Sequence, residues 1–423
     1  MDRNAIHRTV QAVWHMESAK IIARLARMLR SVALAEEIAQ DAFVAALEQW
    51  PERGVPENPA AWLMTTARNR AIDQLRHVKL AERKHASIAG DLDSQSEGEG
   101  ISPGENAIAD DLLRLMFVAC HPVLTVEARV ALTLRLLGGL MPVEIARAFL
   151  ASEAAIQQRI VRAKRTLTEA RVPFEVPDAA ERATRLASVL EVIYLIFNEG
   201  YAATAGEHWM RPALCDEALR LGRILAELAP QESDVHGLVA LMEIQASRLG
   251  ARVAASGEPI LLMQQDRSRW DPLMIGRGLA ALARAESDGR ALGPYALQAA
   301  IAVCHARARA PAETDWKRIV ALYDALAALT PSPVILLNRA VAVSMAYGPA
   351  AALEIVDELR HESRLVDYHL LPSVRGDLLE KLGRFEEARA EFARAASLTR
   401  NARERALLLG RVATCGAAGG RPS

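Results

Sequence analysis

Apolar residues recur every three to four positions through most of this chain, which is the period of an amphipathic α-helix. Strict alternation of apolar and polar residues, the pattern of a strand, is rare. Aromatic residues make up only 4% of the sequence, whereas Ala, Leu and Arg are abundant. We therefore predict an all-α protein, with helices near residues 20–32, 35–49, 60–84, 153–167, 185–200, 214–228, 235–249 and 271–284.

Residues 141–167 are expected to form two short helices joined by a tight turn. Pro142 suits the first turn of a helix, where its missing N–H costs little. Ser152 is a favourable N-cap for the second helix. Leu150 lies where a Gly would adopt positive φ most easily, so the turn has to form without that residue. One apolar stripe is expected on the second helix, at Ile156, Ile160, Ala163 and Leu167.

The opposite face of the second helix is rich in basic and amide side chains. Arg and Gln can hydrogen-bond guanine and adenine edges, and further cations can hold phosphates. A basic second helix behind a short turn is what a helix-turn-helix places in the major groove of DNA. The alternative is an ordinary helical hairpin with a solvated basic face.

A second basic segment follows a proline-containing loop and begins near residue 60. Residues 68–84 contain six basic and two acidic residues, a net charge of +4 in a protein of net charge −1. Such a patch suits a phosphate backbone, and Asn and Arg suit bases outside a duplex stack. A solvated cationic helix is the alternative reading of this segment.

Two acidic features complete this half of the chain. The helix over residues 35–49 has an acidic face that either docks a basic partner or is merely solvated. Residues 86–110 contain no Lys or Arg and several Asp, Glu, Gly and Ser residues. This composition predicts a flexible acidic linker between the two basic modules.

The order of these segments resembles the two-domain core of a sigma-70 family factor of the extracytoplasmic-function type. The resemblance rests on AWLMTTARNRAIDQLR at residues 61–76 and QQRIVRAKRTL at residues 157–167. It implies a region 2 domain over residues 1–85, the linker over 86–110 and a region 4 domain over 111–172. It also implies core RNA polymerase and promoter DNA as partners.

The resemblance assigns roles to particular residues. Those implied to read the −35 promoter element are Glu153, Ala154, Ala155, Gln157, Gln158, Arg159, Arg162, Lys164 and Arg165. Those implied to open and read the −10 element are Trp62, Arg68, Asn69, Arg70, Asp73 and Arg76. Those implied to dock on core polymerase are Glu37, Ile38, Asp41, Phe43 and Glu48.

The chain continues well beyond the region 4 segment, with a helical domain expected over residues 178–290 and repeats over 291–412. Residues 375–398 have Gly, Ala and Phe at the spacings of a tetratricopeptide repeat, and two earlier units near residues 316–331 and 340–353 are degenerate. Stacked helix pairs make a concave surface that binds a protein partner or another part of the same chain. A scaffold without a ligand is the alternative.

The sequence YLIFNEGY at residues 194–201, together with the repeats, resembles the extracytoplasmic-function factors that have a C-terminal tetratricopeptide extension. In that group the extension is thought to regulate the factor, which implies regulation in cis. On their residue types alone, Asn198 and Glu199 suit helix capping. The residues given a regulatory role by the resemblance are Tyr194, Phe197, Asn198, Glu199 and Tyr201.

Other function classes find little support. The four cysteines are far apart without a CxxC pair, and the histidines have no metal-ligand spacing. No nucleotide-binding, zinc-protease or nucleophile-elbow motif occurs, so we expect no cofactor, no metal and no enzymatic activity. No apolar run is long enough to span a bilayer, and a cytoplasmic location is expected. The alternative function is a stand-alone helix-turn-helix regulator with a tetratricopeptide interaction domain, although such a regulator has no reason to contain residues 62–76.

Overall fold

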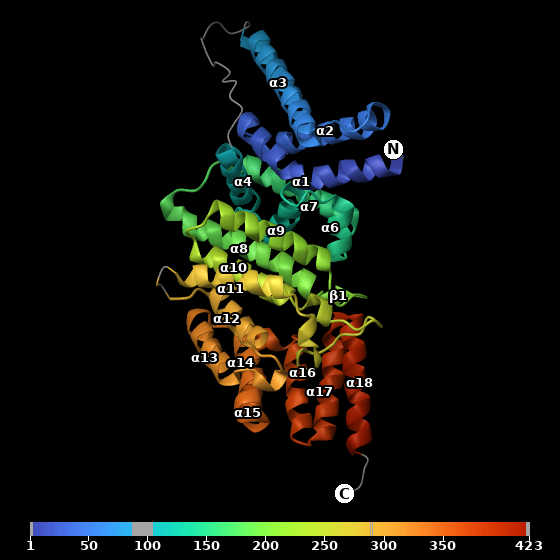
Figure 1. Ribbon diagram of the computed structural model, residues 1–423, viewed down its shortest axis with the longest axis vertical. Coiled ribbons are helices and arrows are strands. Elements are labelled where there is room, and N and C mark those ends of the chain that lie inside the picture. Colours follow the sequence, from blue (N-terminus) through green and yellow to red (C-terminus); the bar gives the residue numbers. More distant parts are fainter. Residues whose placement is uncertain (1–2, 87–104, 288, 290, 420–423) are drawn as a thin grey trace. The chain divides into compact units, whose positions relative to one another are not determined.

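The computed structural model describes residues 3–86, 105–287, 289 and 291–419 and confirms the all-α fold. Its helices α1 to α18 are shown in Figure 1, together with two very short strands. The chain divides into two compact units, residues 1–193 and 194–423. This boundary lies inside helix α8 (Ala179–Tyr201), whereas the sequence analysis expected the helical extension to begin at residue 178.

Within its described residues, the first unit contains helices α1 to α7 and the beginning of α8. Helix α1 packs against α2, α3 and α4, and α7 packs against both α5 and α6. The bounds are α1 Arg3–Leu29, α2 Val32–Arg53, α3 Pro59–Ala86, α4 Glu105–Ala119, α5 Val126–Leu136, α6 Pro142–Phe149 and α7 Glu153–Glu169.

Two boundaries in the first unit differ from the sequence prediction. Helix α4 begins at Glu105, so residues 105–110 of the expected linker are helical, while residues 87–104 lie outside the described residues. Helix α2 continues through Pro51 to Arg53, and the positive φ of Gly54 (84°) then ends it. A proline is tolerated in the last turn of a helix when the chain leaves the helix directly after that turn, as it does here at Gly54.

Helices α6 and α7 form the expected pair joined by a tight turn. The Ser152 hydroxyl accepts a hydrogen bond from the backbone N–H of Ala155 at 3.2 Å, so the predicted N-cap is present. The buried residues of α7 are the four of the predicted stripe: Ile156, Ile160, Ala163 and Leu167. The turn itself places Leu150 in the left-handed region, with φ 50° and ψ 37°.

Replacing Leu150 by Gly should stabilise the first unit by about 1 kcal/mol, because Gly adopts positive φ without the steric cost of a Cβ atom. The Leu150 side chain is 57% exposed, so little buried surface is lost. Urea unfolding of the full chain measures the change. Leu150→Ala is the matched control, since Ala keeps the Cβ atom; an equal gain from both variants would contradict backbone strain as the cause.

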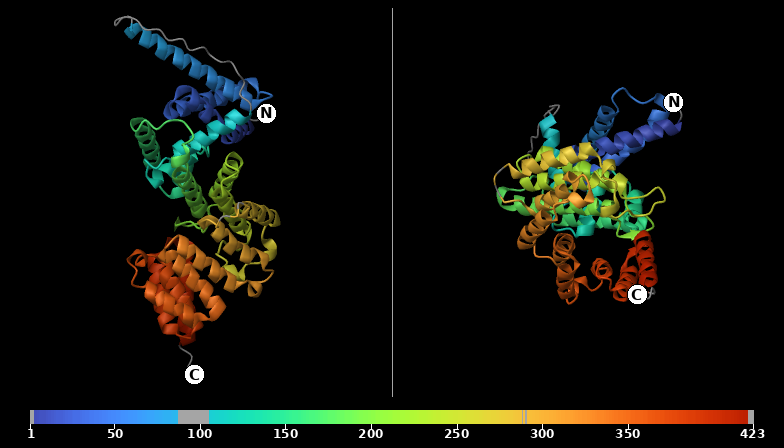
Figure 2. Two further views of the ribbon diagram at one scale, coloured as in Figure 1. Left: turned by 90° about the vertical axis from the view of Figure 1, so that its left-hand side faces the viewer. Right: turned by 60° about the horizontal axis from the view of Figure 1, so that its bottom comes forward.

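The second unit is a succession of helix hairpins, seen from two further sides in Figure 2. From α12 to α18, each helix packs against the next helix in the chain. The longer elements are α9 Pro212–Leu228, α10 Ser233–Ala246, α11 Pro272–Glu286, α12 Pro294–Arg307, α13 Trp316–Leu329, α14 Pro333–Tyr347, α15 Pro349–Leu359, α16 Leu370–Lys381, α17 Phe385–Leu398 and α18 Ala402–Gly419. Five short 3₁₀ turns connect them, at Leu249–Ala251, Leu262–Gln264, Arg267–Arg269, Pro311–Glu313 and Ser363–Leu365.

The strongest predicted repeat forms the hairpin α16–α17. Gly376 of α16 lies directly against Phe392 of α17, where an added Cβ atom would meet the Phe392 ring at 2.8 Å. Phe392 is 1% exposed and belongs to the core shared by α12–α18. The small residue and the large one are therefore complementary parts of one contact, which explains their spacing in the sequence.

The end of the second unit is tied back to its beginning. Strand β2 (Arg400–Asn401) pairs in parallel with β1 (Ala205–Gly206). The buried Asn401 side chain donates to the carbonyl oxygens of Ala203 at 3.0 Å and His208 at 2.9 Å. Its Oδ1 atom accepts from the first backbone N–H groups of α18.

Asn401→Ala should lower the free energy of unfolding of the second unit by about 3 kcal/mol, because it leaves two buried carbonyl groups and a helix cap without partners. Chemical denaturation of the full chain measures this loss. Arg400→Ala is the control, since Arg400 is exposed and only its backbone pairs with β1. A loss below about 1 kcal/mol would mean that water satisfies these carbonyls.

Candidate nucleic-acid and polymerase interface

The outer face of α7 exposes most of the residues predicted to read the −35 element. Glu153, Ala154, Gln157, Gln158, Arg162 and Arg165 are exposed, and Ala155, Arg159 and Lys164 are half-buried. Among the described residues Arg162 donates to the backbone oxygen of Gln158, and Arg165 pairs with Glu169 at 3.4 Å on the surface. Such exposed contacts are weak. The guanidinium groups of this face can therefore turn to an incoming ligand.

Lys164 differs from the other cations of α7 because it already has a buried partner. Its ammonium pairs with Glu36 of α2, a side chain that is only 2% exposed. Glu36 also accepts from Nε of Arg135 on α5 at 2.6 Å. The two cations keep the buried carboxylate satisfied, and they join α2 to α5 and α7.

A second buried carboxylate joins the same parts of the first unit. Asp111 of α4 is 1% exposed and pairs with Arg114 at 2.8 Å, and with Arg24 and Arg27 of α1 at 3.5 and 3.7 Å. Burial raises the pKa of Asp111, and the three guanidinium groups oppose that rise. The predicted region 2 and region 4 helices are thus in direct ionic contact in this arrangement.

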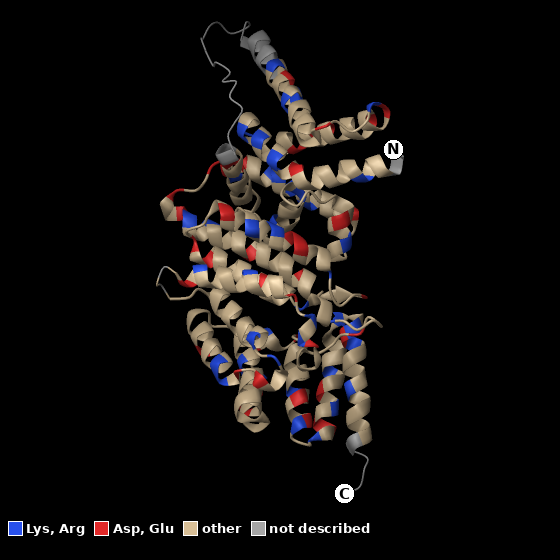
Figure 3. Ribbon diagram, in the orientation of Figure 1, with Lys and Arg blue, Asp and Glu red and all other residues tan. Residues whose placement is uncertain are grey.

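Helix α3 presents the second basic surface, visible as blue segments in Figure 3. Arg68, Asn69, Asp73 and Arg76 are exposed, and Arg70 is half-buried. Asp73 pairs with Arg76 at 3.4 Å. The basic residues beyond His77 have side chains outside the described set.

Trp62, also predicted to contact the −10 element, is half-buried. Its ring meets the buried Trp50 of α2 edge-on, with 5.5 Å between ring centroids. This contact fixes the beginning of α3 against the end of α2 and leaves only part of the indole accessible.

The acidic face predicted to dock on polymerase lies along α2. Glu37, Asp41 and Glu48 are exposed, and Asp41 pairs with Arg70 of α3 at 3.6 Å. Phe43 is half-buried against Trp14, with ring centroids 4.8 Å apart. Ile38 is 5% exposed and belongs to the core, so a direct contact with a partner would be made by the other four residues.

Helix α8 contributes contacts that the sequence analysis missed. Arg129 of α5 donates to Glu191 of α8 at 2.9 Å and also to Ser188. Arg185 of α8 donates to the backbone oxygen of Phe117 at 3.1 Å. The first part of α8 is therefore built into the first unit, against α4 and α5. The available signal was the helical spacing of Arg185, Ser188 and Glu191, which places these three polar residues on one face.

The YLIFNEGY residues make their described contacts within the second unit. Tyr194 donates to Gln298 at 3.0 Å, and Tyr201 donates to Gln245 at 2.8 Å. Glu199 accepts from the Thr204 hydroxyl at 2.9 Å and pairs with Arg211. Glu199 thus holds the loop after α8, as capping would suggest, while its neighbour Asn198 faces a cavity.

The cysteine thiols are buried core groups. All four are free, and burial raises the pKa of Cys120 to about 11 and that of Cys215 to about 12. Thiols with such pKa values are poor nucleophiles at neutral pH. Within the described residues, no helix is both long and apolar enough to cross a membrane.

Comparison with known proteins identifies the first unit. Residues 15–80 match the family described as Sigma-70 region 2, and residues 185–286 match a family of unknown function, DUF6596. The probable ECF RNA polymerase sigma factor SigI of Mycobacterium tuberculosis is 24% identical over 183 residues, which cover 43% of this chain and 62% of SigI. ECF RNA polymerase sigma factor SigK of a Mycobacterium species is 26% identical over 157 residues, 35% of this chain and 76% of SigK.

The chain belongs to the extracytoplasmic-function group of the sigma-70 family. A sigma factor acts in transcription initiation, and core RNA polymerase and promoter DNA are the partners that this family implies. A protein of Rhizobium meliloti (strain 1021), described as uncharacterized, is 47% identical over 386 residues, 91% of this chain and 90% of its own length. That similarity includes most of the extension, so this sigma factor shares its long C-terminal part with a full-length relative.

Proposed function

We propose that this sigma factor binds core RNA polymerase through the acidic face of α2, opens and reads the −10 element with α3, and reads the −35 element with α7. The observation that carries the −35 assignment is the division of α7 into a buried apolar stripe and an outer face with Arg159, Arg162 and Arg165. The tight turn between α6 and α7, with Leu150 in the left-handed region, supports the assignment of a helix-turn-helix.

The competing function is a stand-alone helix-turn-helix regulator. Gel filtration of the full chain with core polymerase, in the absence of DNA, distinguishes the two. A sigma factor co-elutes with the core enzyme. A regulator that uses only α6 and α7 elutes separately and binds a specific duplex by itself.

Promoter binding requires the first unit to open. The −10 and −35 elements lie about 25 base pairs apart, which is about 85 Å at roughly 3.4 Å per base pair. Helices joined by the Glu36 and Asp111 ion pairs belong to one compact body. Moreover, Lys164 is available to a phosphate only when its contact with Glu36 is broken. The free protein is therefore proposed to be a closed form that binds DNA weakly.

Glu36→Gln should favour the open form, because it keeps the size of the side chain and removes the charge that Arg135 and Lys164 share. We expect roughly tenfold tighter binding of the free protein to duplex DNA, since a larger fraction is competent to bind. Fluorescence anisotropy with a labelled duplex measures the affinity. Glu57→Gln, at an exposed position after α2, is the control; unchanged or weaker binding by Glu36→Gln would show that this contact does not limit access to α7.

The extension is proposed to regulate the sigma core in cis, in a supporting rather than a purely inhibitory role. Helix α8 supports this idea because Arg185, Ser188 and Glu191 contact α4 and α5, whereas Tyr194 and Tyr201 contact helices of the second unit. A change in the second unit thus acts on a helix that is also part of the first. A scaffold without influence on the core is the alternative.

Point variants test this better than truncation, because removing α8 would expose apolar core residues of the first unit such as Leu190 and Ile193. Transcription with core polymerase is compared for the wild type, Asn198→Ala and Tyr201→Phe. Lower activity at unchanged melting temperature is the expected result. Higher activity would indicate masking instead, and equal activity would leave the extension as a separate scaffold.

A further inference from the structure

A cavity of about 260 Å³ lies inside the second unit, where the end of α8 meets α10, α12, α13 and α14. Four of the five YLIFNEGY residues singled out in the sequence line it: Tyr194, Phe197, Asn198 and Tyr201. None of its lining residues is charged. The core of the second unit is otherwise built mainly from apolar side chains. A group of polar side chains around one cavity in this unit therefore indicates a binding site.

The polar groups of the cavity are carboxamides and phenols. Asn198, Gln245, Gln298 and Asn338 supply the amides, and Tyr194, Tyr201 and Tyr323 supply the hydroxyls. The two tyrosines of α8 donate to the Oε1 atoms of Gln298 and Gln245, so these amides are held in fixed orientations. Among the described residues the Tyr323 hydroxyl has no hydrogen-bond partner, and burial raises the pKa of Tyr323 to about 12. This hydroxyl therefore stays protonated and can donate into the cavity.

Three of the four aromatic rings that line the cavity already make contacts with other aromatic or cationic groups. Phe197 and Tyr201 stack on each other, with centroids 5.7 Å apart and planes 17° apart. The guanidinium of Arg252 lies 3.6 Å from the Tyr201 centroid, and Tyr194 meets Tyr295 edge-on at 5.3 Å. These contacts leave a flat ligand such as a nucleobase fewer ring faces to stack on, and the amides and hydroxyls supply the other recognition groups.

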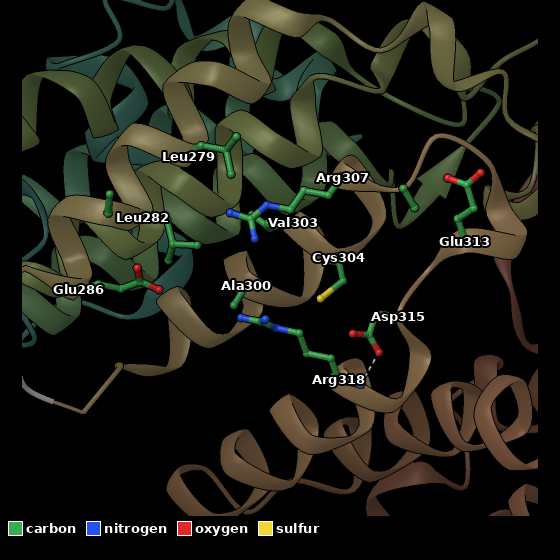
Figure 4. A pocket seen from close by; sticks show the side chains of 12 residues that line it. Leu279, Leu282, Glu286, Ala300, Val303, Cys304, Arg307, Glu313, Asp315 and Arg318 are labelled. Atoms are coloured by element: carbon green, nitrogen blue, oxygen red, sulfur yellow. Dashed lines mark hydrogen bonds between the residues drawn. The ribbon is translucent and has the colours of Figure 1, made fainter.

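A larger cavity of about 490 Å³ between α11, α12 and α13 provides a contrast. Figure 4 shows charged side chains around it together with Cys304; the charged ones are Glu286, Arg307, Glu313, Asp315 and Arg318. The five charged side chains that line this cavity are exposed, so water satisfies them. In the smaller cavity the polar side chains are half-buried, apart from the exposed Asn338, and tyrosine hydroxyls orient two of the amides.

We propose that the cavity lined by YLIFNEGY binds a small uncharged polyhydroxylated ligand, of the monosaccharide or cyclic-polyol class. Hydroxyl groups both donate and accept, and so do the carboxamides and phenols that surround the cavity. Its volume would hold about nine water molecules at roughly 30 Å³ each, which suits a single sugar ring. An anionic ligand is disfavoured because the two arginines that contact lining residues are already engaged. Arg248 donates to Gln245 Oε1 at 3.2 Å, and Arg252 is bound to the Tyr201 carbonyl and ring.

Binding to the full chain, without polymerase or DNA, tests this inference independently of the proposed function. The probes are D-glucose and myo-inositol, with D-glucuronate and inositol monophosphate as charged counterparts and N-acetylglycine N-methylamide as a peptide mimic. Thermal shift and isothermal titration calorimetry report binding. At least one neutral polyol should raise the melting temperature in a concentration-dependent way, and its charged counterpart should not.

Two variants locate the site. Tyr323→Phe removes one hydroxyl and should weaken polyol binding roughly fivefold to tenfold, whereas Tyr347→Phe, at a 60% exposed position of α14, should not change it. Gln245→Leu is the second variant if Tyr323→Phe does not fold. No binding by either polyol, or equal binding of neutral and charged probes, overturns the proposal and leaves a water-filled cavity. Binding of the peptide mimic alone would assign the cavity to a peptide, and unchanged affinity in the variants would place the polyol elsewhere.

Discussion

Replacing Glu37 and Asp41 together by Lys is expected to abolish binding to core RNA polymerase. Both carboxylates are exposed on α2, and neither is needed to satisfy a buried group. If this face meets a basic surface of the polymerase, each charge reversal replaces an attraction by a repulsion. Like charges placed opposite each other at an interface cost several kcal/mol. We expect the affinity to fall by at least about two orders of magnitude, at roughly 1.4 kcal/mol per factor of ten.

The variant should remain folded, because Asp41 has only one described ion partner, Arg70, and that pair is exposed. Circular dichroism and melting temperature check this. Glu52→Lys is the matched control, since Glu52 is an exposed acid near the end of the same helix and outside the proposed docking set. Core binding retained by the Glu37→Lys, Asp41→Lys protein would return this face to simple solvation.

Replacing Arg159 or Arg162 by Ala should lower affinity for the −35 element by about 1–3 kcal/mol for each arginine that contacts a base edge. Arg162 is exposed and donates to the Gln158 backbone oxygen. Arg159 is half-buried near Glu127. The pKa of Glu127 is lowered mainly by hydrogen bonds at the beginning of α5 and also by the charge of Arg159. Together the two changes should remove most promoter-dependent transcription.

The sequence dependence of the loss shows which contact is made. A base contact weakens the cognate duplex selectively, whereas a phosphate contact weakens every duplex alike and reduces the salt dependence. Arg182→Ala is the control, because it removes an exposed cation from α8 outside the proposed DNA-binding set. Normal promoter use by both Arg159→Ala and Arg162→Ala would show that α7 does not read the groove.

The sequence predicted those structural features that depend on residues close together in the chain. The stripe from Ile156 to Leu167 follows from helical period alone, and Ser152 caps α7 because its hydroxyl reaches the next turn. The hairpin α16–α17 was predictable because Gly376 and Phe392 must be complementary in size. The tetratricopeptide-like arrangement of the second unit follows from repeated contacts of this kind.

Features that depend on distant partners could not be predicted in this way. Glu36 lies on the same helix as several exposed acidic residues, and nothing in the local sequence indicates that it is buried. Its burial depends on the distant partners Arg135 and Lys164. Gly200 was expected to end α8, but the helix continues to Tyr201. The Gly is there because a Cβ atom would lie 2.6 Å from the Cys215 backbone nitrogen. The cavity lined by YLIFNEGY could not be predicted, because its lining residues come from five helices that are far apart in the sequence.

The most direct test of the account is run-off transcription with core RNA polymerase, genomic DNA fragments and the full chain. The account predicts discrete transcripts that core polymerase alone does not make. It further predicts that these transcripts disappear with the Glu37→Lys, Asp41→Lys protein and with the Arg159→Ala, Arg162→Ala protein, but persist with Glu52→Lys and Arg182→Ala. A folded protein that yields no transcripts beyond those of core polymerase, while still binding a specific duplex by itself, would contradict a sigma-factor mechanism and favour the stand-alone regulator.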